Sequence, residues 1–217
     1  VLTVFFFFFL WCRLVSDPAI VQDIKNLKAA ESAGRLFIVP FYSVEDYLFL
    51  LRDLARRLAA AALAPRSLFV LAAAVSDFYV PLASRPEHKI QSRGGSERLA
   101  LEMDPVPKCL GAVRHWAPKA AVISFKLETD QDILLSKAEA ALSSYGLAGV
   151  VANKLETRYR EVWVVEPPGG EPTSGCPVRT RLEAVPGGDE IEAALVRKMV
   201  AMHEAWMQGE EEREKNG

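Results

Sequence analysis

The sequence is poor in cysteine, and the few cysteines that it has give no sign of a disulfide scaffold or a zinc site. Among 217 residues there are three, Cys12, Cys109 and Cys176, an odd number spread widely along the chain. Their spacing matches no zinc-binding pattern, and such usage is typical of a reducing compartment. Cys109 falls in an amphipathic helical stretch, where a buried inert thiol is favoured over a nucleophile. We therefore expect a cytoplasmic protein with no metal held by its own residues.

A block of positive charge is also missing. The formal net charge is −2, and no run of five or more basic residues occurs. Proteins that bind nucleic acid usually carry a basic patch or stripe, so the composition argues against a nucleic-acid partner. The chain is long enough for one sizeable core, in one domain or two small ones.

Three widespread glycine-containing motifs are absent. The sequence has no G-x-G-x-x-G, no G-x-x-x-x-G-K-[ST] and no G-x-S-x-G, which mark dinucleotide sites, P-loops and hydrolase elbows respectively. The pair Gly94-Gly95 lies between two expected strands, which favours a turn over a phosphate cradle. The missing glycine fingerprint counts against an unrelated Rossmann-like nucleotide binder.

The chain opens on an apolar run, VLTVFFFFFLWC, that ends at Arg13. A membrane-spanning helix needs about 20 apolar residues, so a membrane role is not expected. The run has the length of a signal-peptide core, but it lacks a preceding basic segment and a small-x-small cleavage pattern. Three alternatives stay open for this start: a truncated or mis-spliced beginning, a signal or anchor, and a buried strand.

The rest of the chain alternates between strands and helices. Strands are expected at 36–41, 67–75, 121–125, 149–152, 161–165 and 178–184. Helices are expected weakly within 13–34, then at 44–63 after Ser43, at 104–116, from Thr129 to Tyr145 before Gly146, and at 189–206. A hairpin is expected from 88–92 and 99–103. This order is typical of an α/β fold with a three-layer, Rossmann-like, mostly parallel sheet.

The same pattern predicts the limits of the folded domain. We expect residues 1–30 to form an atypical leader and 31–207 to form the α/β domain. Residues 208–217, QGEEEREKNG, are dominated by charge, and we expect a disordered tail there.

Polar residues follow three of the expected buried strands. Asp77 comes after 67–75, the group 126–129 after the next, and Asn153 after the third. In open parallel sheets ligands bind beyond the carboxyl ends of the strands, so these groups are expected to converge on one rim. Simpler interpretations stay open: Asp77 could cap a turn, and Asn153 could merely end its strand.

A lysine could add positive charge to this rim. Lys89 follows a short loop with two prolines after Asp77, and His88 beside it could also line a site. An exposed lysine on a hairpin remains the alternative interpretation of Lys89.

Several longer strings in the sequence are similar to a known family. AAAVSDFYVP, EHKIQS, VPK, WAPKA, ISFKLETD and VVAN occur in this order from residue 72 to residue 153. In order and spacing they resemble the phosphopantothenate–cysteine ligases, in particular the eukaryotic branch. The resemblance is strong over 66–166, extends to 31–65 and 189–206, and does not include the residues before 30.

The resemblance implies an enzyme of coenzyme A biosynthesis that joins 4′-phosphopantothenate to L-cysteine. ATP, or CTP in the bacterial branch, would activate the substrate carboxylate as an acyl-nucleotide and release pyrophosphate. The cysteine amine would then displace the nucleotide monophosphate. Carboxylate and triphosphate are both anions, so Mg²⁺ and a lysine are expected to offset their repulsion.

The matching strings also imply which residues meet which ligand. Ala73, Ala74 and Asp77 of AAAVSDF would contact phosphopantothenate. Phe125 of ISFKLETD and Asn153 of VVAN would contact the nucleotide, with Phe125 near the base.

Two lysines are implied as sources of positive charge. Lys89 of EHKIQS matches the family's lysine on a segment over the site, which stabilises charge at the phosphates or the acyl-nucleotide. Lys126 is a weaker candidate for the same role. The hairpin at 88–103 matches the arm through which the family forms homodimers.

The sequence also departs from the family. The ligases open with a GGT-like strand and turn and then an Asn-Phe-Ser-Ser-Gly-like loop, which cradle the phosphates, and neither run is present. We hypothesise that the chain keeps the carboxyl-terminal part of a ligase and lacks much of the nucleotide site. The alternative is a truncated, non-catalytic homologue that dimerises with a full-length partner.

Overall fold

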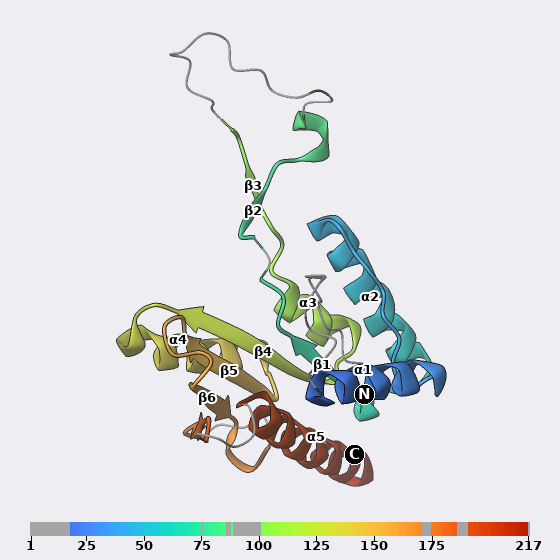
Figure 1. Cartoon of the computed structure of the whole chain (residues 1–217). Helices are drawn as coiled ribbons and strands as arrows, with labels where there is room; N and C mark the ends of the chain where they lie inside the picture. Colours follow the sequence, from blue (N-terminus) through green and yellow to red (C-terminus); the bar gives the residue numbers. More distant parts are fainter. Residues whose placement is uncertain are drawn as a thin grey trace.

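A five-stranded sheet forms the centre of the protein in the order β1-β4-β5-β6-β7 (Figure 1). The computed structural model describes residues 18–74, 76–85, 88, 101–170, 175–185 and 191–216. The strands are β1 (Leu68–Leu71), β4 (Ala121–Glu128), β5 (Gly149–Lys154), β6 (Glu161–Glu166) and β7 (Val178–Glu183). Strands β1, β4 and β5 run parallel, and β6 and β7 extend the sheet antiparallel. The expected α/β class with a mostly parallel central sheet is confirmed.

Helices cover both faces of this sheet. The helices are α1 (Pro18–Ser32), α2 (Val44–Ala60), α3 (Cys109–Trp116), α4 (Gln131–Tyr145) and α5 (Ile191–Asn216), with short 3₁₀ turns at Ala64–Arg66, Leu82–Ser84 and Pro168–Gly170. Side chains alternate between the faces of a strand. Val122 of β4 therefore packs with α2, α3 and α4, whereas its neighbour Ile123 packs with α5. The result is the expected three-layer arrangement.

Helix boundaries follow the capping signals in the sequence. The hydroxyl of Ser43 accepts the N–H of Asp46 at 3.1 Å, and the Asp46 carboxylate accepts the N–H of Ser43 at 3.1 Å. This capping box satisfies two backbone donors at the start of α2. Helix α4 is capped by Asp130 rather than by Thr129, and it ends as expected at Gly146, whose φ is +58°.

The expected strand at 36–41 is wrong. Residues Leu36 to Tyr42 connect α1 and α2 without strand pairing, and Phe37 and Ile38 are 64% and 44% exposed. An apolar run becomes a strand only where a neighbouring strand takes up its backbone hydrogen bonds. In the described part of the chain β1 pairs with β4 alone, so this run has no such neighbour. Pro40 also removes one donor.

The helix expected at 104–116 begins later, at Cys109. Pro105 and Pro107 lack backbone N–H groups, and each disfavours helical geometry at the preceding residue. Asp104 and Pro105 instead form strand β3. The sequence pattern was therefore right for the last turns of this helix and wrong for its start.

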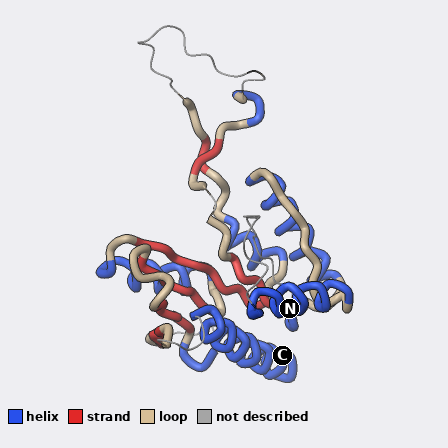
Figure 2. Tube along the Cα trace, viewed as in Figure 1, coloured by secondary structure: helices blue, strands red, loops and turns tan. Residues whose placement is uncertain are grey.

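A short two-stranded sheet follows β1 in the chain. Strand β2 (Phe78–Tyr79) pairs antiparallel with β3 (Asp104–Pro105), and Figure 2 shows this pair standing away from the sheet. The hairpin predicted at 88–92 and 99–103 lies mostly outside the described residues, and 101–103 form a loop. Of the helices in the described ranges, none is both long and apolar enough to cross a membrane.

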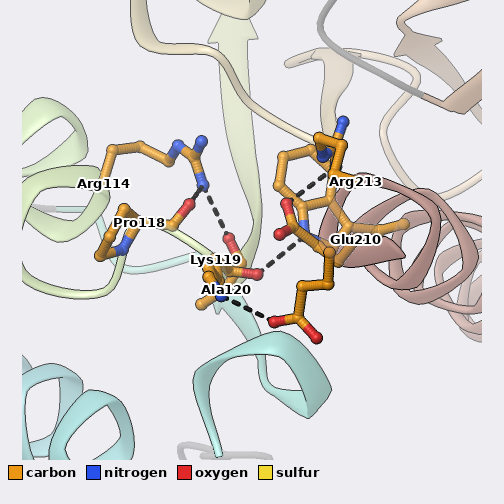
Figure 3. A network of polar contacts seen from close by, with 8 residues as sticks. Arg114, Pro118, Lys119, Ala120, Glu210 and Arg213 are labelled. Carbon is orange, nitrogen blue, oxygen red and sulfur yellow. Dashed lines mark hydrogen bonds and ion pairs between the residues drawn. The ribbon is translucent and has the colours of Figure 1, made fainter. Parts of the chain in front are cut away.

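The end of α5 is held against the segment that enters β4 (Figure 3). The indole N–H of Trp206 donates to the backbone carbonyl of Lys119 at 3.0 Å, and the Lys119 ammonium lies 2.7 Å from the Glu214 carboxylate. The guanidinium groups of Arg114 and Arg213 lie 5.1 and 5.8 Å from the Trp206 ring centre. The helix therefore continues through Asn216, and the disordered tail expected from 208 is wrong.

Candidate functional site

The parallel strands bring their carboxyl ends to one edge of the sheet, as the sequence predicts. Leu71, the last residue of β1, pairs with Ser124 of β4, and Asn153 of β5 pairs with Leu127 of β4. The loop that follows β1 therefore leaves the sheet next to Phe125. Ligands bind at this kind of edge in open parallel sheets.

Ala73, Ala74 and Asp77, the residues expected to contact phosphopantothenate, lie exposed in the segment after β1. The hydroxyl of Ser76 donates to the carbonyl of Phe78 at 2.7 Å and also accepts its N–H at 3.3 Å. The carbonyl of Asp77 accepts the N–H of Val106 at 2.9 Å. The backbone around Asp77 is thus fixed at the root of the β2–β3 ladder, while its carboxylate stays open to solvent.

Phe125 and Asn153 lie on the same face of the sheet. Residues two apart in a strand share a face, and so do residues paired across strands. Leu127 shares a face with Phe125 and pairs with Asn153, which links all three. Phe125 packs against the apolar cluster under α5, but Leu127 is 50% exposed, so this end of the face is open.

Asn153 carries a polar side-chain atom for which the described part of the chain offers no partner. Its side-chain oxygen Oδ1 is buried and accepts no hydrogen bond from the described residues. Leaving a buried acceptor unsatisfied costs about 1–3 kcal/mol, and such atoms are rare in folded proteins. An atom of this kind at a ligand-binding edge can accept a donor from a bound molecule, such as an amino or hydroxyl group.

Lys126 lies on the opposite face of the sheet from Phe125 and Asn153. Its ammonium is 3.2 Å from the Glu128 carboxylate, which also lies 2.9 Å from the ammonium of Lys137 in α4. The hydrogen bond from Lys137, and to a lesser extent the one from Lys126, holds the pKa of Glu128 below its usual value, so this carboxylate stays ionised. Of the residues expected to contact the nucleotide, Phe125 and Asn153 therefore lie on one face of the sheet, and Lys126 lies on the other.

Two residues of this group were not singled out from the sequence. Glu128 lies within ISFKLETD, and the two-residue period of a strand places it on the same face as Lys126, a signal that was available. Lys137 reaches Glu128 only through the packing of α4 on β4, for which the sequence holds no local signal.

Two further expectations concern Lys89 and a metal ion. Lys89 lies outside the described residues, so its expected role at this edge stays a prediction. Across the described ranges, His, Cys, Asp and Glu side chains do not gather in groups of three or more that could hold a metal ion.

Comparison with known proteins identifies relatives of the chain. Residues 52–162, about half of the chain, match the family model described as the DNA/pantothenate metabolism flavoprotein C-terminal domain. The human protein named phosphopantothenate–cysteine ligase is 41% identical over 193 residues, which cover 88% of this chain and 58% of that protein. Phosphopantothenate–cysteine ligase 2 of Oryza sativa subsp. japonica is 42% identical over 190 residues, which cover 87% and 55%.

A solved structure is similar as well. A mutant of Cab2 in complex with phosphopantothenate-cysteine superposes with a TM-score of 0.74 at 33% identity, covering 90% of this chain and 63% of that one. The chain therefore spans little more than half the length of the curated relatives that it matches.

Proposed function

The chain belongs to the family of the DNA/pantothenate metabolism flavoprotein C-terminal domain, and from this we propose that it serves as a phosphopantothenate–cysteine ligase in coenzyme A biosynthesis. The carboxylate of 4′-phosphopantothenate attacks the α-phosphorus of ATP, releases pyrophosphate and forms an acyl-adenylate. The amine of L-cysteine then attacks the acyl carbon, and the amide forms as AMP leaves. CTP takes the same role if the base pocket accepts a pyrimidine.

One observation carries the proposal. Over 90% of its length the chain follows the fold of a protein whose structure is a complex with phosphopantothenate-cysteine, the compound that this reaction yields after its two steps. The open edge formed by β1, β4 and β5 supports the same assignment, because it holds polar groups from successive strands where ligands bind in such sheets.

The segment after β1 is proposed to hold phosphopantothenate. Ala73 and Ala74 carry small side chains and lie exposed, so a ligand can approach their backbone closely. Asp77 presents an exposed carboxylate on a backbone fixed at both sides. Hydroxyl and amide donors of the pantothenate moiety are suitable partners for that carboxylate. These contacts would orient the substrate carboxylate toward the nucleotide.

The open face beside β4 and β5 is proposed to hold the nucleotide. Phe125 offers a partly buried ring against which a base can pack, and the unpaired Oδ1 of Asn153 accepts a hydrogen bond from the same ligand. Lys126, whose side chain would meet the phosphates at the carboxyl edge from the opposite face of the sheet, and Lys89 are proposed to offset the negative charge of the phosphates. Mg²⁺ is proposed to arrive bound to the triphosphate, because a cage of three protein ligands is not found in the described ranges.

A pyrophosphate-release assay on the purified chain tests the ligase assignment. We expect release that requires ATP, phosphopantothenate and Mg²⁺, and formation of the cysteine amide when cysteine is added. Isothermal titration of ATP and of phosphopantothenate separately measures each half of the site. Absence of both pyrophosphate release and ligand binding would contradict the assignment.

A non-catalytic homologue that dimerises is the second candidate. The β2–β3 ladder, which stands away from the sheet, favours it, because a projecting arm offers backbone edges to another subunit. Light scattering distinguishes the two candidates when it is combined with the release assay: a dimer without turnover supports the homologue, and a dimer with turnover supports the ligase. We propose a cytoplasmic protein in either case, with a homodimer for the ligase and a dimer with a full-length partner for the homologue.

A further inference from the structure

We infer that Glu128 is a positioning residue of the proposed nucleotide site, which, anchored by Lys137, holds the ammonium of Lys126 at the carboxyl edge of the sheet. This inference rests on the proposed function, because it assigns Lys126 to the phosphates of a bound nucleotide. It adds two residues, Glu128 and Lys137, that act on the ligand through another side chain.

The ammonium groups of Lys126 and Lys137 both pair with the same carboxylate oxygen of Glu128. Oε1 of Glu128 lies 3.2 Å from Nζ of Lys126 and 2.9 Å from Nζ of Lys137. The side chain of Glu128 is 15% exposed, whereas those of Lys126 and Lys137 are 39% and 48% exposed. The carboxylate is therefore the sheltered centre of the group, and both ammonium groups remain open to solvent and to a ligand.

The position of Glu128 sets the direction in which Lys126 points. Glu128 is two residues further along β4 on the same face, about 7 Å nearer the carboxyl end at the usual rise of a strand. Its carbonyl also accepts the N–H of Leu155 at 2.9 Å, which ties it to the chain just beyond β5. An ion pair with this residue draws the Lys126 ammonium toward the edge and away from the middle of the α4 face.

Lys137 changes the charge balance of the group. A single lysine paired with a single glutamate would be neutral and would offer little net attraction to a phosphate. Two ammonium groups around one carboxylate carry a net charge of +1, and each ammonium has three N–H donors, so Lys126 keeps donors for an anion. Lys137 also holds Glu128 against α4, so the carboxylate is fixed when a ligand arrives.

A purely structural tie between β4 and α4 is the competing explanation, and a double-mutant cycle separates the two. Calorimetric titration of ATP with Mg²⁺ into the full chain would be run on the wild type, E128Q, K126M and the double variant at one ionic strength. We expect E128Q to weaken ATP binding about tenfold, comparable to the loss of one charge-assisted hydrogen bond. We expect the same substitution to have no effect on ATP affinity in the K126M background.

The chain offers a matched control. Lys154 and Glu156 form a neighbouring ion pair at 3.1 Å, and Glu156 is exposed, so E156Q removes a comparable charge nearby. We expect E156Q to leave ATP affinity within about twofold of wild type, which excludes a general electrostatic effect. Circular dichroism and thermal unfolding would establish that each variant is folded.

The outcomes separate the inference from the function on which it rests. A wild-type chain that binds no ATP would sink both the nucleotide site and the role of Glu128. A wild-type chain that binds ATP would overturn only the positioning role if E128Q had no effect, or if its effect were the same with and without Lys126. A tenfold loss that disappears in K126M would establish that Glu128 acts through Lys126.

Discussion

The methyl group of Met202 lies where a side chain at Gly149 would begin. A Cβ atom at Gly149 would stand 2.0 Å from Cε of Met202 and 3.4 Å from the carbonyl oxygen of Val165. Gly149 opens β5, and Met202 belongs to the apolar cluster beneath α5. The absence of a side chain at Gly149 therefore lets α5 lie close to β5, the strand that carries Asn153.

Gly149→Ala tests this close approach. We expect it to lower the free energy of unfolding by about 1 kcal/mol, at the low end for overpacking, because the added methyl group meets the terminal methyl of the flexible Met202 side chain, which can shift. Urea denaturation measures the change. In a Met202→Ala background, where the clashing atom is gone, the cost of Gly149→Ala should shrink, and an unchanged cost would show that Met202 is not the cause.

Replacement by alanine should lower the stability of the protein at Gly146 and raise it at Gly111. Gly146 ends α4 with φ of +58°, so Gly146→Ala places a Cβ in left-handed backbone and should destabilise the protein by about 1 kcal/mol. Gly111 lies within α3 with ordinary contact to the Tyr145 ring at 3.5 Å. Gly111→Ala should stabilise by about 0.5–1 kcal/mol, and thermal unfolding compares the two. Equal signs would contradict the backbone explanation.

Asn153→Leu should separate stability from ligand binding. Leucine has a similar size and removes a buried acceptor that has no partner among the described residues, so we expect the unfolding free energy to rise by about 1 kcal/mol. The same change deletes the proposed nucleotide contact, and ATP affinity should fall about tenfold. Chemical denaturation and calorimetry measure the two effects. Unchanged ATP affinity would remove Asn153 from the nucleotide site.

His203 should make the protein sensitive to mild acid. It is buried in α5, its Nε2 has no partner in the described residues, and burial lowers its pKa below the usual 6.5, an effect that Glu204 opposes. The unfolded chain therefore binds this proton more readily than the folded protein does. The stability that neutral His203 contributes is fully present above about pH 6.5 and is lost as the pH falls through the folded-state pKa.

Denaturation midpoints at several values between about pH 7.5 and pH 5.5 test this prediction. We expect the midpoint of the wild type to fall over this range. His203→Leu removes the titrating group, so its midpoint should depend less on pH in the same window. Identical slopes for the two proteins would mean that other groups dominate.

Local signals were sufficient for the elements that depend on local interactions. The capping box of Ser43 and Asp46, together with apolar residues at helical spacing, predicted α2. The continuous apolar runs predicted β4 and β5, which are buried on both faces. The run at 36–41 is also mostly apolar, but it contains Pro40 and has no neighbouring strand in the described part of the chain, and pairing is a property of the whole fold rather than of the run.

The candidate site was predictable only where it depends on the pattern within a strand or on the ends of strands. The rule that ligands meet the carboxyl ends of parallel strands directed attention to Asp77 and Asn153; the structure has Asn153 near the carboxyl end of β5 and Asp77 in the segment after β1. The separation of Lys126 from Phe125 follows from the period of a strand and was available from the sequence. The contact of Lys137 with Glu128 was not, because it depends on how α4 packs across β4.

Strand β1 is a candidate site of aggregation in samples of the purified chain. It consists of Leu68, Phe69, Val70 and Leu71, and in the described part of the chain it pairs on one side only. No charged residue, proline or bulge within it blocks the other side, which makes it a template for pairing with further extended chains. Aggregation of concentrated samples should therefore be governed by these four residues more than by the small net charge of −2.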